Sequence, residues 1–150
     1  PRTGRQMYDG DVDLYMFMKC LELSEHEIVY NGDITSLEKY QELTRMFPSV
    51  DKWMIGRGVL SDPFLAEKIL YGDNWSAADK IKIISAFHDE LFEEYSKTLS
   101  GSAHITDRMK ELWYYLGNFF SNADKIKKKI NKIRDVKHYL DVINSIFESK

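Results

Sequence analysis

Two apolar segments that each end in a glycine turn constrain the fold of this chain more than any other feature. They are residues 28–33, Ile-Val-Tyr-Asn-Gly-Asp, and residues 53–58, Trp-Met-Ile-Gly-Arg-Gly. A helical stretch lies between them, so their spacing is that of one strand–helix–strand unit. Consecutive parallel strands of a (β/α)8 barrel show this pattern when the loops after them hold a phosphate. Glycine suits such loops because a phosphate must approach backbone N–H groups closely, and a Cβ would block that approach.

The residues around these turns predict an alternation of helices and strands in the first half of the chain. Thr35 and Glu38 have the spacing of a capping box, which places a helix start there. Both strands are nearly continuous apolar runs, which is typical of parallel strands covered on both faces. Cys20 falls within the first helix, where we expect a buried, unreactive thiol. The expected elements are a helix over 11–24, a strand over 27–31, a helix over 35–47, a strand over 52–56 and a helix over 62–71.

From residue 76 onward the apolar residues recur at helical spacing, and no segment indicates a strand. Breaks at 100–102 and 121–122 separate helices in this half, which is predicted to be a small bundle of about four helices. The first stripe consists of Ile81, Ile84, Phe87 or His88, Leu91 and Tyr95. A turn at 71–74 is the expected boundary between two domains, 1–72 and 73–150. The fold class is therefore α/β followed by all-α.

Composition limits the classes of protein that this chain can belong to. Its 150 residues are too few for a complete barrel, which needs about 250, and it starts at Pro1 without a methionine. We therefore expect a piece of a longer protein. The single cysteine excludes an internal disulfide and a Cys-rich zinc site, and it fits a reducing, cytoplasmic compartment. The four histidines have no metal-ligand spacing, and no apolar run approaches the roughly 20 residues of a membrane span.

The formal net charge of −3 conceals an asymmetry along the chain. Residues 1–103 carry 11 basic and 18 acidic side chains, whereas residues 104–150 carry 10 basic and 6 acidic ones. The positive excess lies in 125–137, where Asp135 is the single acid. Such a cluster is commonly a solvated helix face, but it also suits binding to a phosphate backbone. Its basic residues are Lys125, Lys127, Lys128, Lys129, Lys132, Arg134 and Lys137.

Asn31, Gly32, Gly56 and Arg57 follow the ends of the two predicted strands, where barrel enzymes place their functional residues. One such turn alone would be an ordinary connection. Two turns on adjacent strands favour a phosphate site, with Arg57 supplying positive charge. Asp33 contributes a backbone N–H to this site or caps a local helix, because its carboxylate would repel a phosphate.

Two further groups leave alternatives open. Aromatic residues within 113–120 could stack on nucleic-acid bases, although a helical aromatic stripe is more often part of a core. Arg2, Thr3 and Arg5 precede the first helix in a basic, polar loop, and the sequence alone does not fix their role.

Several segments, taken in order and spacing, resemble the last part of the tRNA-dihydrouridine synthase family. Residues 1–3, Pro-Arg-Thr, are similar to the H-x-R-T segment that follows the sixth strand of that family's barrel. Residues 31–33, Asn-Gly-Asp, resemble its N-G-D/E turn after the seventh strand, and Gly56-Arg57 its G-R turn after the eighth. Residues 108–116 are similar to the R-x-K-x-x-x-x-Y-L stretch of its helical domain. The resemblance covers essentially the whole chain.

This resemblance implies the last two βα units of an FMN-binding TIM (β/α)8 barrel, followed by a helical tRNA-binding domain. The family is implied to reduce uridine to 5,6-dihydrouridine in tRNA, with NADPH as the reductant and a cysteine as the proton donor. Its N-G-D/E and G-R turns hold the FMN phosphate. The residues to which that role carries over are Asn31, Gly32, Asp33, Gly56 and Arg57.

The same resemblance gives the basic residues of the chain an expected partner. Contacts with tRNA are expected at Arg2 and Thr3 and, in the helical domain, at Lys127, Lys128 and Lys132. The basic cluster of 125–137 would then have a function beyond solvation.

The departures from the family pattern concern catalysis. The family's histidine would precede Pro1, and its strand-5 lysine and catalytic cysteine lie further upstream, so this chain holds none of them. Cys20 cannot replace that cysteine because it lies on a helix and not in the active-site loop. We therefore expect the chain to be inactive alone. We also expect residues 1–70 to self-associate or to pack on the helical half, because strands without their barrel leave edges uncovered.

Two other functions remain open from the sequence. Another FMN-dependent barrel oxidoreductase, such as a relative of dihydroorotate dehydrogenase, would act on a small molecule and would have no affinity for RNA. A non-catalytic helical RNA-binding module with a barrel remnant would need no flavin. The colour of the full-length protein would separate the second alternative from the enzymes.

Overall fold

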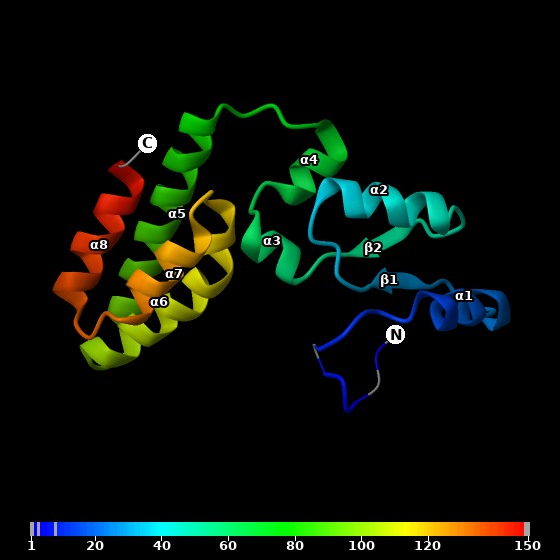
Figure 1. The fold of residues 1–150 in the computed structure, drawn as a ribbon, viewed down its shortest axis with the longest axis horizontal. Coiled ribbons are helices and arrows are strands. Elements are labelled where there is room, and N and C mark those ends of the chain that lie inside the picture. Colours follow the sequence, from blue (N-terminus) through cyan, green and yellow to red (C-terminus); the bar gives the residue numbers. More distant parts are fainter. Residues whose placement is uncertain (1, 3, 8, 149–150) are drawn as a thin grey trace.

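The structure is a computed structural model, and it describes residue 2, residues 4–7 and residues 9–148. A small sheet and its helices form one part, and a bundle of longer helices forms the other (Figure 1). No described helix is both long and apolar enough to cross a membrane. In chain order the elements are α1 (Leu14–Leu23), β1 (Val29–Asn31), α2 (Leu37–Met46), β2 (Lys52–Met54), α3 (Arg57–Ser61), α4 (Leu65–Tyr71), α5 (Ala77–Thr98), α6 (Ser102–Leu116), η1 (Gly117–Phe119), α7 (Ala123–Asn131) and α8 (Val136–Glu148).

The two strands pair in parallel, as the sequence predicts, with Tyr30 opposite Trp53 and Asn31 opposite Met54. Each strand is shorter than predicted, with three residues. The expectation that both faces are covered is wrong for the described residues. Side chains from α1 and α2 pack only on the Tyr30 side, and Val29 and Met54 on the other side are 49% and 54% exposed.

Tyr30 organises the core of the first half and is only 1% exposed. Its ring centroid lies 4.8 Å from that of Phe17 on α1 and 5.2 Å from that of Trp53 on β2. Phe47, after α2, closes the cluster, with its ring centroid 5.0 Å from that of Phe17. Cys20 is exposed, which corrects the expected burial. The reason is that α1 has no fully buried residue, so its far side faces solvent.

Between β1 and α4 the structure corrects one local prediction and adds a helix that the sequence did not indicate. The N-cap of α2 is Ser36 and not Thr35, because the Ser36 hydroxyl accepts a hydrogen bond from the Lys39 N–H at 3.2 Å. The five-residue helix α3 was not predicted at all. Its Gly58 is buried, and a Cβ there would overlap the carbonyl oxygen of Ile34. Gly58 is therefore needed for the close approach of α3 to the segment after β1.

Every described secondary-structure element from residue 76 onward is a helix, as predicted. The stripe on α5 runs through His88, which is fully buried, and not through Phe87, which is 47% exposed. Phe64, which precedes α4, packs into the core of the helical half together with residues such as Met109 and Trp113. Helix α3 also contacts α6. The domain boundary at 72/73 stays a prediction. Phe64 and α3, which precede it in the chain, pack against the helices that follow it.

A polar network is buried inside this helical core. Trp113 donates its indole N–H to the Tyr139 hydroxyl at 2.9 Å, and His88 Nε2 lies 2.7 Å from the same oxygen. An indole N–H can only donate, so the Tyr139 O–H donates to Nε2. The His88 proton then lies on Nδ1, 3.0 Å from a carboxylate oxygen of Asp89. Burial lowers the pKa of His88, although Asp89 opposes that effect.

Replacing Gly58 with alanine tests the close approach of α3. We expect Gly58→Ala to lower the free energy of unfolding by about 1–3 kcal/mol, because the backbone at Ile34 must shift to make room. Urea unfolding measures this change. The matched control is Gly4→Ala, where a Cβ would meet no atom within 4 Å. Equal unfolding midpoints for the two variants would contradict the packing argument.

The buried network predicts a dependence of stability on pH. Because the pKa of His88 is lower in the folded chain, the unfolded chain takes up a proton first as the pH falls below about 6.5. The His88 contribution to stability is therefore complete above that pH and is lost below it. An NMR titration should show His88 titrating below pH 6.5, and the unfolding free energy of His88→Gln should fall less between pH 7 and pH 5.5. A titration midpoint of His88 at or above pH 6.5 would rule out this contribution of His88 to the pH dependence of stability.

Candidate functional site

The turns after β1 and β2 meet at one cavity of about 320 Å³, which we call the turn cavity. They meet because the carboxyl ends of parallel strands lie at the same edge of a sheet. The cavity brings together every residue predicted for the phosphate, and Arg2 from the N-terminal segment joins them. The predicted residues that line it are Asn31, Gly32, Asp33, Gly56 and Arg57.

Asp33 binds two arginines that come from distant parts of the sequence. Its Oδ1 accepts a hydrogen bond from Arg57 at 2.5 Å, and its Oδ2 accepts one from Arg2. Arg2 also donates to the carbonyl oxygen of Gly10 at 2.9 and 3.2 Å. The sequence predicts a backbone N–H contact or a helix cap for Asp33, and it does not indicate this ion pairing. The partners lie 31 and 24 residues away, so no local pattern could indicate them.

The ion pairing favours the ionised forms of Asp33 and Arg2. Partial burial alone would raise the pKa of Asp33, but the hydrogen bond from Arg2 and the charges of Arg2 and Arg57 outweigh it and lower that pKa. The hydrogen bond to Asp33 raises the pKa of Arg2. The group therefore presents a net charge of about plus one to the cavity.

The two glycines of the site differ in the space around them. A Cβ on Gly32 would lie 3.0 Å from the Tyr30 hydroxyl and 3.1 Å from a methyl carbon of Val12, so packing constrains that position. A Cβ on Gly56 would meet no atom within 4 Å. Gly56 therefore leaves room that a ligand can use, whereas Gly32 lets the turn close over Tyr30.

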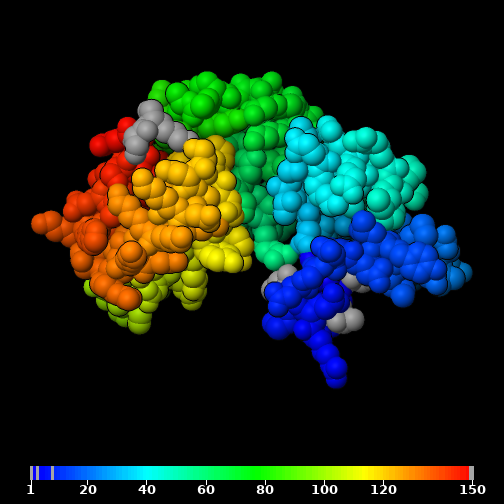
Figure 2. Space-filling view, in the orientation of Figure 1, coloured from blue at the N-terminus to red at the C-terminus, as the bar shows by residue number. Residues whose placement is uncertain are grey.

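A second cavity of about 510 Å³, which we call the interface cavity, adjoins the first and reaches the helical half. Both cavities share Arg2, Asp33, Thr35 and Arg57. The surface is hollowed between the N-terminal segment and the yellow helices in Figure 2. The charged residues that line the interface cavity are Arg2, Lys39, Arg57 and Lys127, with Asp33 as the acid.

Lys127 holds α7 against the neighbouring elements at this cavity. It donates a hydrogen bond to the Asn118 side chain at 2.5 Å, and its ammonium lies 5.4 Å from the centre of the Tyr114 ring. Asn118 in turn donates to the hydroxyl of Ser61 on α3 at 3.2 Å. A Cβ on Gly117 would lie 3.1 Å from the Lys127 stem. Lys127 is thus placed partly by packing.

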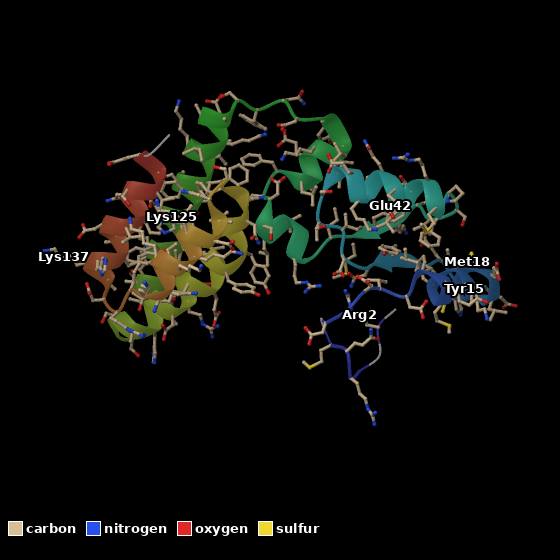
Figure 3. All side chains as sticks on the ribbon, in the orientation of Figure 1. Arg2, Tyr15, Met18, Glu42, Lys125 and Lys137 are labelled. Atoms are coloured by element: carbon tan, nitrogen blue, oxygen red, sulfur yellow. The ribbon has the colours of Figure 1, made fainter. Side chains whose placement is uncertain are left out.

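The other residues predicted to contact RNA do not all lie at these cavities. Lys128 and Lys132 are exposed and line neither cavity, and Lys125 and Lys137 also lie on the helical half, far from Arg2 (Figure 3). Thr3 lies outside the described residues.

The aromatic cluster is divided as well. Trp113 and Phe120 are buried in the helical core, whereas Tyr114 and Tyr115 line the interface cavity. Cys20 is not among the residues that line either cavity. Across the described part of the chain, no group of three or more His, Cys, Asp or Glu side chains is placed to hold a metal ion.

Comparison with known proteins places this arrangement in a family. A family model described as dihydrouridine synthase (Dus) matches residues 1–150. The chain is 26% identical over 144 residues to a probable tRNA-dihydrouridine synthase of Rickettsia prowazekii (strain Madrid E), covering 89% of this chain and 41% of that protein. It is 28% identical over 153 residues to tRNA-dihydrouridine synthase B of Pasteurella multocida (strain Pm70), covering 97% and 44%.

A probable tRNA-dihydrouridine synthase of Rickettsia typhi (strain ATCC VR-144 / Wilmington) is 29% identical over 126 residues, covering 77% of this chain and 36% of that protein. The chain thus spans less than half the length of these relatives. Because the family model covers the whole chain, this protein belongs to the dihydrouridine synthase family.

Proposed function

We propose that this chain is the C-terminal part of a tRNA-dihydrouridine synthase, and that its turn cavity holds the phosphate of FMN. The single observation that carries the proposal is the meeting of the two glycine turns with Arg2 and Arg57 at one cavity. Membership of the family and the order of the motifs along the chain support it.

The residues of the turn cavity fit a phosphate. Arg2 and Arg57 supply guanidinium groups, which match the geometry of phosphate oxygens and remain charged at any working pH. Gly56 leaves open space beside them. Asp33 is tied to the arginines, so its negative charge is compensated. When bound, the flavin would supply the hydride that reduces a uridine, with NADPH as the ultimate reductant.

We assign binding and orientation, and no proton transfer, to the residues of this chain. Cys20 is unsuitable as the proton donor because it lies on the solvent side of α1 and lines neither cavity. The proposal therefore takes the cysteine from another part of the complete enzyme. The free thiol and the tRNA substrate are both consistent with an enzyme of the cytoplasm.

The interface cavity is the proposed path of the tRNA beside the flavin site. Four cations and one acid line it, which favours a polyanion over a small neutral substrate. Tyr114 and Tyr115 add aromatic surface to the same wall. Lys127 would contact a phosphate there, and the exposed Lys128 on α7 and Lys132 just after it would extend the contact.

The uncovered face of the sheet supports the barrel assignment. Parallel sheets are normally buried on both faces, yet Val29 and Met54 are about half exposed. We infer that further strands of a TIM barrel cover this face in the complete enzyme. In the chain alone, the same exposed face would favour self-association.

Blocking the turn cavity tests the flavin assignment. In the full-length protein, Gly56→Val should reduce FMN affinity about tenfold or more, because a Cβ there meets no protein atom within 4 Å and the added side chain would take up space needed by the ligand. Flavin absorbance after purification and the unfolding midpoint measure the two effects. Gly4→Val is the control, because Gly4 also has open space and lies outside the cavity. Normal flavin content in Gly56→Val would refute the assignment.

Removing single lysine charges tests the path of the tRNA. Lys127→Met keeps the packing stem, and it should weaken tRNA binding and reduce the slope of log affinity against log salt by about 1. The double variant Lys128→Met/Lys132→Met should reduce the slope further if both contact phosphates. Filter binding of the full-length protein across a salt series measures the slope.

The control for these variants is Lys82→Met, because Lys82 is an exposed lysine on α5 that lines neither cavity. The flavin content should stay constant in all of them. Affinity and slope that remain at the wild-type values in the Lys127 and Lys128/Lys132 variants would remove the RNA-binding role of α7.

A further inference from the structure

We propose that Asp33 is a positioning residue that holds Arg2 and Arg57 in place to receive a phosphate, so that losing its negative charge weakens phosphate binding. This inference rests on the proposed function, because it concerns the same turn cavity. By this inference Asp33 favours phosphate binding, although its negative charge by itself would repel a phosphate.

The carboxylate of Asp33 is positioned to pair with two arginines at once. Its backbone has φ of +46°, a left-handed conformation that few residue types adopt easily. Each carboxylate oxygen then accepts from a different guanidinium, Oδ1 from Arg57 and Oδ2 from Arg2. Arg2 comes from the N-terminal segment and Arg57 from the start of α3, so Asp33 joins two separate parts of the site.

The charges explain why a carboxylate is useful beside an anion site. Arg2 and Arg57 both line the turn cavity, and their like charges repel each other when no anion is present. A long arginine side chain also loses rotamer freedom whenever a ligand fixes it. Asp33 compensates the repulsion and fixes both side chains in advance, so less ordering remains when a phosphate binds.

The exposure of the two arginine side chains is consistent with positioning by Asp33. The side chain of Arg2 is 14% exposed and that of Arg57 is 38% exposed, so both are held yet still open to the cavity. The lowered pKa of Asp33 means that its carboxylate stays ionised throughout the neutral range. Asp33 can therefore pair with both arginines at neutral pH.

Comparing FMN with riboflavin isolates the phosphate. Both carry the same ring system and ribityl chain, but only FMN carries the phosphate, so the ratio of their dissociation constants reports the phosphate contact alone. The variants are Asp33→Asn and Asp33→Gly in the full-length protein stripped of flavin. Asparagine and glycine both tolerate a positive φ, so the turn keeps its backbone.

We expect FMN affinity to fall about tenfold or more while riboflavin affinity stays constant, with the larger loss in Asp33→Gly. Removing a negative charge would by itself strengthen anion binding, so an unchanged or increased preference for FMN overturns the inference. Equal losses for both flavins indicate a merely structural role and also overturn it. Asp73→Asn is the matched control, because Asp73 pairs with Lys80 at 2.5 Å and lines neither cavity.

The wild-type protein separates this inference from the proposed function. If it binds riboflavin as tightly as FMN, the phosphate assignment of the turn cavity is wrong, and the role of Asp33 fails with it. If it prefers FMN and the Asp33 variants keep that preference, only the positioning role is wrong.

Discussion

The parallel pairing of β1 with β2 is the constraint on which the site depends. Its register places Asn31 opposite Met54, so both strands end at the same edge and their turns open into one cavity. A shift of one residue would also turn Tyr30 out of the aromatic core, because side chains alternate between faces. The packing of Tyr30 against Phe17 and Trp53 therefore fixes the register that assembles the site.

Close backbone approach joins this sheet to the helical half. Gly58 lets α3 lie against the carbonyl of Ile34, and α3 in turn contacts α6. Phe64 packs into the helical core, and the hydrogen bond from Asn118 to Ser61 crosses between the halves. The interface cavity is bounded by both halves as a result. The four cations that line it come from separate segments of the chain. They meet because these contacts hold the two halves together.

Much of the fold could be predicted from local pattern. The apolar runs before the glycine turns gave the two strands and their parallel pairing, and helical spacing gave the helices from residue 76 onward. The errors arose where a hydrogen bond or contact decides between neighbouring residues. Ser36 and not Thr35 caps α2, and α3 is too short to leave a periodic signal. Cys20 was expected to be buried, but it is exposed, because the side chains of α1 that pack against the core are Leu14, Phe17 and Leu21.

The sequence by itself determined which residue types could form an anion site, since a glycine after each strand allows close approach and Arg57 after the second strand supplies positive charge. Tertiary structure alone decided how those residues are used. Arg2 and Arg57 reach Asp33 across 31 and 24 residues, and no propensity acts over such separations. Likewise, Gly32 and Gly56 look equivalent in the sequence, but packing surrounds only Gly32. Local sequence fixes backbone preference, whereas the space and charge around a side chain depend on segments that folding brings together.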